Sequence, residues 1–234
     1  MTRPGGRGVL PPFAPGSFLA QLSPSVLEEL LAGRQRTFAP GERLLREGGT
    51  DTHMFLLLRG FVKITAVMDG VETLLAIRVP GDSLGEVAAM SGRPRIATVT
   101  ACGRVLTVVR TQAAVKAFIR AHPEAAALMT AAVGERLHWA NRRRADFFTY
   151  SVEVRLARVL LDLSHTCGRP TDAGVLIDVQ LTQAELASMI GAGEATVQKA
   201  IRNLRERGLI STGYRRITIV DMAELHKVSE EPDD

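Results

Sequence analysis

The chain has 234 residues, of which 46% are hydrophobic and 23% are charged. This balance is typical of folded globular proteins and excludes a collagen-like repeat, a disordered chain and a disulfide-stapled mini-protein. The length accommodates two domains. The net charge of +4 permits a nucleic-acid partner without requiring one, so the distribution of charge along the chain has to decide.

Cysteine, histidine and apolar content restrict cofactors and location. The chain has two cysteines, Cys102 and Cys167, which lie 65 positions apart. Two thiols are too few for a disulfide framework or for a four-cysteine cluster. The histidines are scattered and His165-x-Cys167 is a weak metal motif, so we predict no metal. The first residues lack the apolar stretch of a signal peptide, and no window approaches 18 uncharged apolar residues. We therefore expect a cytoplasmic protein without a membrane segment.

The first half of the chain has the texture of a small β domain. Residues 1–16 are rich in proline and glycine and predict a flexible arm. Ser23 and Pro24 open a short helix that ends at Gly33. Over residues 17–110, runs of β-branched and aliphatic residues alternate with glycine turns such as Asp69-Gly70, which indicates a compact antiparallel sandwich or barrel.

Helical periodicity returns over residues 111–148. A short helix is followed by one of about 26 residues, roughly 39 Å, that starts at Pro123. Its apolar positions form a broad stripe: Leu128, Ala131, Ala132, Leu137, Trp139 and Ala140. So long a helix between two compact parts favours packing against its twin in a homodimer, and the alternative is a helix that lies along its own domain. Residues 147–150 are predicted to form a hinge.

Residues 149–228 predict a second domain with a helix-turn-helix, followed by an acidic tail over 229–234. Thr182 and Glu185 form a T-x-x-E capping box, and Gly191 allows a tight turn between two helices. The second helix, from Glu194 to about residue 207, would enter the major groove of DNA. The strand pair that follows would form a wing with Arg215 and Arg216 at its tip.

Positive charge is concentrated in this segment. Between Glu194 and Arg216 there are six basic and two acidic residues, so this short stretch carries a net charge of +4. DNA-binding surfaces need such an excess, whereas the alternative is a basic helix face that is merely solvated. The candidate DNA-binding residues are Thr182, Glu194, Ala195, Gln198, Lys199, Arg202, Arg205, Arg215 and Arg216.

The order of these segments resembles the cyclic AMP receptor and FNR-like (CRP/FNR) family of bacterial transcription regulators. The phrases that carry the resemblance are VRLARVLLDL, GDSLGEVAAMSGRPRIATVTA and LTQAELASMIGAGEATVQKAIRNLRERGLI, and it extends from about Phe18 to about Val220. The resemblance implies an α+β fold with an N-terminal antiparallel β-roll of the cyclic-nucleotide-binding type, a long dimerisation helix and a C-terminal winged helix-turn-helix. It implies a homodimeric regulator whose partners are an inverted repeat in double-stranded DNA and RNA polymerase.

An enzyme is the alternative from another class, and the sequence argues against it. It contains no G-x-S-x-G, H-E-x-x-H or Walker motif.

The DNA-reading positions depart from the family pattern. Where the family often has Arg, Glu and a second Arg, this chain has Glu194, Ala195 and Lys199. Glu194 could accept a hydrogen bond from a cytosine amino group, Gln198 could pair with adenine, and Lys199 could reach guanine or a phosphate. The arginines of this surface are assigned to phosphates: Arg202, Arg205, Arg215 and Arg216. We therefore expect an inverted repeat other than the usual family sequence.

The resemblance also implies a pocket for a cyclic nucleotide such as cyclic AMP. Glu86 matches the carboxylate for a ribose hydroxyl, Arg95 matches the arginine for the cyclic phosphate, and Gly85 lets the backbone approach. The candidate effector-binding residues are Gly85, Glu86, Arg95, Ile96, Ala97 and Asn141.

Three positions weaken that assignment. Ile96 replaces the hydroxyl residue that follows the arginine, and Ala140 and Asn141 replace a Thr-Ser pair. The alternative is a constitutive regulator with a degenerate pocket, in which Glu86 and Arg95 form a structural ion pair. Trp139 either stacks on a base or belongs to a dimer core.

Overall fold

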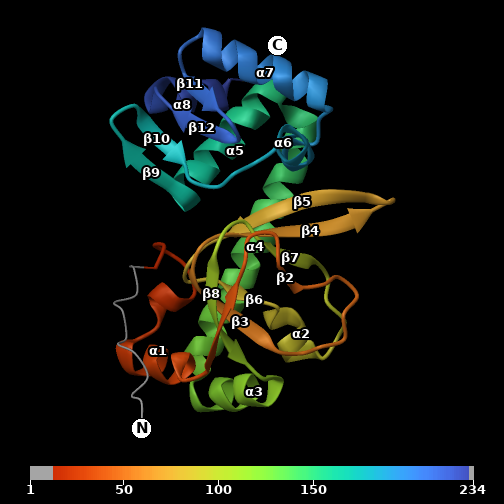
Figure 1. Ribbon diagram of the computed structural model, residues 1–234, viewed down its shortest axis with the longest axis vertical. Coiled ribbons are helices and arrows are strands. Elements are labelled where there is room, and N and C mark those ends of the chain that lie inside the picture. Colours follow the sequence, from red (N-terminus) through yellow and green to blue (C-terminus); the bar gives the residue numbers. More distant parts are fainter. Residues whose placement is uncertain (1–12, 232–234) are drawn as a thin grey trace. The chain divides into compact units, whose positions relative to one another are not determined.

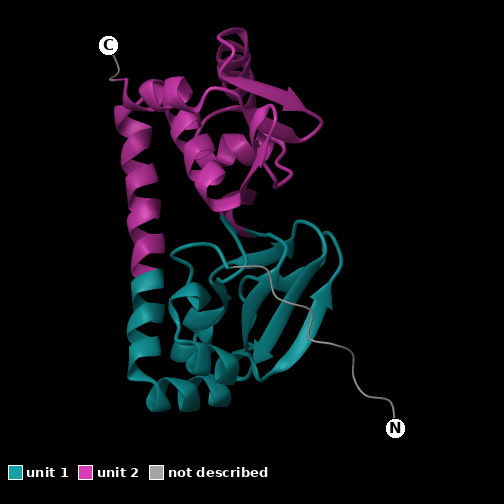
Figure 2. Ribbon diagram, turned by 90° about the vertical axis from the view of Figure 1, so that its left-hand side faces the viewer, with its two compact units in different colours: residues 1–63, 77–132 teal, residues 64–76, 133–234 magenta. Residues whose placement is uncertain are grey.

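The computed structural model describes residues 13–231, which are shown with their helices and strands in Figure 1. They divide into two compact units, coloured separately in Figure 2. The first consists of residues 13–63 and 77–132, and the second of residues 64–76 and 133–231.

The first unit is the antiparallel β-roll that the sequence predicts, with helices at its two ends in the sequence. Its elements are the 3-10 helix η1 (Leu19–Gln21), α1 (Pro24–Leu31), β1 (Arg34–Phe38), β2 (Arg43–Leu45), β3 (Met54–Arg59), β6 (Ser83–Leu84), α2 (Glu86–Ser91), β7 (Thr98–Ala101), β8 (Val105–Arg110) and α3 (Gln112–Ala121). One sheet has the order β1-β8-β3-β6. In it β1 pairs with β8 from Arg34 opposite Val109 to Phe38 opposite Val105.

Two elements pass from one unit to the other. The hairpin of β4 (Val62–Met68) and β5 (Val71–Arg78) completes a second sheet of order β2-β7-β4-β5. The long helix α4 (Pro123–Thr149) begins in the first unit and ends in the second. Asp69 and Gly70 both have positive φ, 50° and 81°, so the hairpin turn predicted at these residues is formed by them.

The core of the first unit lies on both faces of β3, because successive side chains of a strand point to opposite faces. Met54, Leu56 and Leu58 are buried against residues of α1, α3 and the start of α4. On the other face, the rings of Phe55 and Phe38 meet edge to face with centroids 5.4 Å apart. The strand is therefore buried on both faces from Met54 to Leu58, and only Arg59 at its end is exposed.

The N-terminal arm was predicted to include residues 13–16, and the structure differs there. Phe13 packs against the core cluster, and the amide of Ala14 donates to the carbonyl of Pro80 over 3.2 Å. Burial of an aromatic ring outweighs the turn-forming composition of this segment. Residues 1–12 of the predicted arm lie outside the described residues.

The second unit contains the winged helix-turn-helix. Its elements are α5 (Val152–Cys167), β9 (Gly168–Thr171), β10 (Gly174–Ile177), α6 (Gln183–Ile190), α7 (Glu194–Glu206), β11 (Ile210–Gly213), β12 (Arg216–Ile219) and α8 (Met222–Glu230). The strands form one sheet of order β11-β12-β10-β9. α5 contacts α6, α7 and α8 (Figure 1), and its apolar side chains, which include Leu156, Leu160 and Leu163, are buried.

Two predictions about the ends of this domain need correction. The predicted acidic tail begins at 229, but Ser229 is buried as part of α8, whose apolar face includes Leu225 and Val228. The predicted hinge over 147–150 is mostly helical, since α4 continues through Thr149. The helix break lies at Ser151, whose hydroxyl accepts a hydrogen bond from the amide of Val154 over 3.3 Å and so caps α5.

The tip of the β4–β5 hairpin belongs to the second unit, although the sequence assigned it to the sensor. The amide of Leu74 donates to Oγ of Ser188 in α6 over 3.0 Å. The carbonyl of Leu75 accepts a hydrogen bond of 2.9 Å from Arg143 in α4. Residues 64–76 are thus hydrogen-bonded to helices α6 and α4 of the second unit.

Candidate nucleic-acid interface and effector pocket

The turn between α6 and α7 is built by local interactions. Thr182 Oγ1 accepts from the amide of Glu185 over 3.1 Å, and Glu185 Oε2 accepts from the amide of Thr182 over 2.8 Å. This reciprocal capping box starts α6. Gly191 ends the helix at φ +62°, and a Cβ there would lie 3.0 Å from the ring of Phe147. The turn therefore needs glycine for both its backbone conformation and its space.

The helix α7 has one buried and one exposed face. Val197, Ile201 and Leu204 are buried against the unit. The outward residues Glu194, Gln198, Arg202 and Arg205 recur at spacings of four and three, so they share one side of the helix. This side presents polar and charged groups in the way that a DNA-reading helix requires.

A groove of ~730 Å³ brings this face together with the wing. Of the predicted DNA-binding residues, its lining includes Thr182, Glu194, Gln198, Arg202, Arg205, Arg215 and Arg216. The other two, Ala195 and Lys199, are exposed on α7 but do not line the groove. Four arginines against one glutamate give the groove the positive charge that a phosphate backbone selects.

Gln183 and Tyr214 are among the groove residues that the sequence analysis did not include. Gln183 lines the groove and its Oε1 accepts from Nε2 of Gln198 over 2.6 Å. Tyr214 lies at the tip of the wing with 84% of its surface exposed, beside the guanidinium of Arg215. An aromatic residue in a polar turn was the available signal for Tyr214, whereas Gln183 has none apart from its place after the N-cap.

The predicted effector pocket lies in the first unit, around a buried arginine. Only 2% of the Arg95 side chain is exposed. Its Nη1 donates to the carbonyl of Gly85 over 2.9 Å, and its Nη2 donates to the carbonyl of His53 and to Asp51 Oδ2. Gly85 has φ +79°, and a Cβ there would collide with the guanidinium. Glycine is therefore required at position 85, because the Arg95 guanidinium passes so close to the backbone there.

The remaining predicted pocket residues have different surroundings. Glu86 is buried at the start of α2, Ala97 is half-buried, and Ile96 is 70% exposed. Asn141 is exposed on the part of α4 that belongs to the second unit. The structure pairs Arg95 with Asp51, a residue that the sequence reasoning did not include.

Comparison with known proteins identifies both units. Residues 35–122 match the cyclic nucleotide-binding domain family, and residues 154–228 match the Crp-like helix-turn-helix domain family. A CRP-like cAMP-activated global transcriptional regulator from Mycobacterium tuberculosis is 30% identical over 189 residues, which cover 80% of this chain and 84% of the relative. This chain belongs to the CRP/FNR family of transcriptional regulators.

Other members of the CRP/FNR family agree with this assignment. The transcriptional regulator SdrP from Thermus thermophilus is 29% identical over 83% of this chain and 93% of the relative. The crystal structure of a CRP/FNR-family regulator from the same organism superposes with a TM-score of 0.72 and 27% identity, covering 86% of this chain and all of that one. The chain is thus a transcription regulator with a helix-turn-helix and is not an enzyme.

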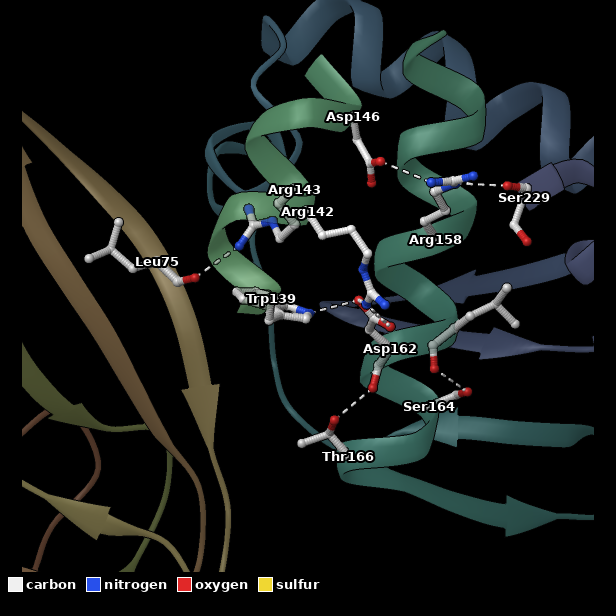
Figure 3. A network of polar contacts seen from close by, with 11 residues as sticks. Leu75, Trp139, Arg142, Arg143, Asp146, Arg158, Asp162, Ser164, Thr166 and Ser229 are labelled. Carbon is white, nitrogen blue, oxygen red and sulfur yellow. Dashed lines mark hydrogen bonds and ion pairs between the residues drawn. The ribbon is translucent and has the colours of Figure 1, made fainter. Parts of the chain in front are cut away.

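Trp139 of this CRP/FNR-family chain has a role that the sequence did not indicate. Its indole Nε1 donates to Asp162 Oδ2 on α5 over 2.8 Å, and the guanidinium of Arg143 lies 4.4 Å from its ring centroid (Figure 3). The indole of Trp139 thus joins α4 to α5. Burial lowers the pKa of Arg143 to about 10, and the charges of Asp162 and Asp146 oppose that shift.

A second arm of the network in Figure 3 runs from α4 to α8. Asp146 on α4 accepts a hydrogen bond of 2.9 Å from Arg158 of α5. Nε of Arg158 also donates to the carbonyl of Ser229 in α8 over 2.8 Å. Three helices of the CRP/FNR-type DNA-reading unit are thereby joined through a single guanidinium.

Neither a membrane span nor a metal cluster is found in the part of the chain that the structure describes. No helix between residues 13 and 231 is both long and apolar enough to cross a membrane. Within the same residues, histidine, cysteine, aspartate and glutamate side chains form no group of three or more that could hold a metal ion.

Proposed function

We propose that this CRP/FNR-family regulator binds an inverted repeat in double-stranded DNA as a homodimer, with α7 of each subunit in the major groove. The observation that carries the proposal is the groove in which the exposed face of α7 and the wing arginines meet. A recognition helix with an adjacent basic wing contacts base edges and phosphates at the same time.

The side chains along this groove divide into two groups by their chemistry. Glu194 can accept from a cytosine amino group and Gln198 is suited to adenine, so these residues supply sequence preference. Lys199 reaches guanine or a phosphate from its exposed position on α7. Arg202, Arg205, Arg215 and Arg216 bind phosphates and supply affinity that is independent of sequence.

The α4 helix supports the homodimer. Leu128 and Ala132, which the predicted stripe includes, pack on the core of the first unit. Ala131, Ala140 and Leu137 are exposed, the last at 62%, and Leu137 and Ala140, three residues apart, share one side of the helix. An apolar face that is left uncovered on a long helix is suited to the same helix of a second subunit.

The dimer is tested by sedimentation of Leu137→Glu. We expect this variant to be a monomer, because a charge would be buried in the helix pair. Glu135→Lys changes a charge nearly opposite on the same helix and should leave a dimer. A dimer in both variants would refute the use of this face.

DNA recognition is tested by selecting binding sites from a random double-stranded library with the full chain. We expect an enriched inverted repeat whose half-sites are about 34 Å apart, one turn of the duplex. Gln198→Ala should relax the preference at one position, whereas Arg202→Ala should weaken binding to all sequences alike. Arg169 is exposed in the same unit but does not line the groove, so Arg169→Ala is the control. Absence of any enriched sequence would refute the proposal.

A cyclic nucleotide is the effector class that the sensor unit supports best. The relative from M. tuberculosis is described as cAMP-activated, and Gly85 and Arg95 form a cradle of the right charge. The ion pair of Asp51 with Arg95 and the exposed Ile96 favour the alternative, a regulator that needs no ligand. DNA affinity measured with and without cyclic AMP separates them, since a several-fold change supports effector control and no change supports the alternative.

A further inference from the structure

We infer that Asp51 is an internal competitor for the anionic group of the effector, because its carboxylate contacts Arg95 at the guanidinium that would bind a cyclic phosphate. The inference rests on the effector side of the proposed function and names a residue that sets its affinity. The competition affects ligands that carry a phosphate, and not those that bind elsewhere in the roll.

The contact between the two side chains is of the kind that a phosphate would make. Asp51 Oδ2 accepts from Nη2 of Arg95 over 2.7 Å and from its Nε over 3.2 Å. The remaining nitrogen, Nη1, is held by the carbonyl of Gly85. A guanidinium offers an anion its paired N–H groups, and here one carboxylate oxygen already holds two of them.

The chain between β2 and β3 positions this carboxylate. The amide of Gly48 donates to the carbonyl of Arg95, and the amide of Arg95 donates to the carbonyl of Gly49, each over 2.8 Å. A Cβ at Gly49 would lie 2.9 Å from Asp51 Oδ1 and 3.5 Å from the Arg95 side chain. Glycine is therefore needed where the loop passes the ion pair, and the backbone bonds bring Asp51 to Arg95.

The two members of the pair differ in exposure, which makes the carboxylate displaceable. The Asp51 side chain is 45% exposed, against 2% for Arg95. A ligand can thus take over the buried cation while the carboxylate turns into solvent. The ligand has to replace two charge-assisted hydrogen bonds before it gains any affinity.

The charges around the carboxylate keep it in its competing form. Burial acts to raise the pKa of Asp51, but the hydrogen bond and charge of Arg95 outweigh this effect, and the pKa lies below its ordinary value. His53 Nδ1 lies 3.1 Å from Asp51 Oδ2, and burial lowers the pKa of this histidine. At neutral pH the carboxylate is therefore ionised beside a neutral imidazole.

The test is calorimetric titration of the full chain with cyclic AMP and cyclic GMP. Asp51→Asn removes the charge of the side chain and keeps its shape. The affinity of this variant for at least one of the two nucleotides should therefore be about tenfold higher than that of the wild type, or more. The double variant Asp51→Asn, Arg95→Ala should lose that gain. Asp172→Asn, the same change of charge in an exposed turn of the second unit, should bind as the wild type does.

The results of this titration support or overturn the inference as follows. Equal affinity of the wild type and Asp51→Asn, or no binding to either, overturns the inference. If Asp51→Asn unfolds, inorganic phosphate provides the second readout: it should restore the fold by replacing the missing anion, and failure to do so overturns the inference. DNA binding is measured separately by site selection, so loss of this inference leaves the DNA-binding proposal intact, and failure of DNA binding is seen in the selection alone.

Discussion

The indole of Trp139 and the carboxylate of Asp162 form a hydrogen bond of 2.8 Å that joins α4 to α5. The same carboxylate lies 3.3 Å from the guanidinium of Arg142. Arg143, stacked on the indole ring, in turn donates to the carbonyl of Leu75 in the β4–β5 hairpin. Figure 3 shows these side chains together, with the hairpin on one side of α4 and α5 on the other. Trp139, together with Arg143, thus connects α4, α5 and the β4–β5 hairpin of the DNA-reading unit.

Asp162→Ala should shift the fluorescence of Trp139 to longer wavelength, because the indole loses its partner and gains water. Trp139 is the only tryptophan of the chain, so the emission reports this site alone. The free energy of unfolding should fall by about 1–2 kcal/mol in urea titrations. Arg142→Ala removes the half-exposed ion pair but not the indole bond, and its effect should be smaller. Equal effects of the two variants would contradict a contribution from the indole bond.

The contact of His122 with Glu29 should make the stability of the first unit depend on pH. His122 Nε2 lies 2.8 Å from Glu29 Oε2, and Nδ1 lies 3.4 Å from Glu124 Oε1. The hydrogen bond to Glu29 raises the pKa of His122 above its ordinary value. Because the pKa is higher in the folded state than in the unfolded state, the protonated histidine stabilises the fold. This stabilisation is fully present below the unfolded pKa of about 6.5, and it is lost as the pH rises through the folded pKa.

The measurement is the melting temperature of the wild type and Glu29→Gln across this range. The difference between them should be larger at about pH 5.5 than at about pH 8.5. Glu135→Gln makes the same change of charge on α4 and should show no such trend. A difference that does not vary with pH would rule out the histidine as its cause.

The elements that local sequence signals specify could be predicted from the sequence. The T-x-x-E box at Thr182, the glycine at 191 and the apolar spacing of Val197 and Ile201 each act within one or two turns of helix. The β-roll and the winged domain followed from such signals together with the family resemblance. The predicted residues that line the groove come from the N-cap of α6, from α7 and from the wing, which are close in sequence.

Contacts between segments distant in sequence could not be predicted in this way. Asp51 and Arg95 are 44 positions apart, and no periodicity relates a loop aspartate to an arginine on another loop. Leu74 and Ser188, which join the hairpin to α6, are 114 positions apart. Trp139 looked like an apolar helix position because its indole N–H finds Asp162 only after α4 and α5 pack together. Pairing of this kind is a property of the tertiary structure.

Thr182→Ala should destabilise the second unit by about 1 kcal/mol, the usual value of a helix N-cap. The threonine hydroxyl is one half of a reciprocal pair with Glu185, so its loss leaves an amide of the first turn of α6 without its cap. Thr182→Ser retains the hydroxyl and should unfold at nearly the wild-type urea concentration. If serine were as damaging as alanine, the methyl group and not the cap would be responsible.

Arg215→Asn should separate stability from DNA binding. Arg215 has φ +53°, a left-handed conformation that asparagine adopts more readily than arginine. The free energy of unfolding should therefore stay the same or rise by up to about 1 kcal/mol, as strain is relieved. Loss of one phosphate contact should weaken DNA binding and reduce the slope of log affinity against log salt by about 1. Arg215→Lys keeps the charge and should keep the slope, so an unchanged slope in Arg215→Asn would show that this arginine does not contact a phosphate.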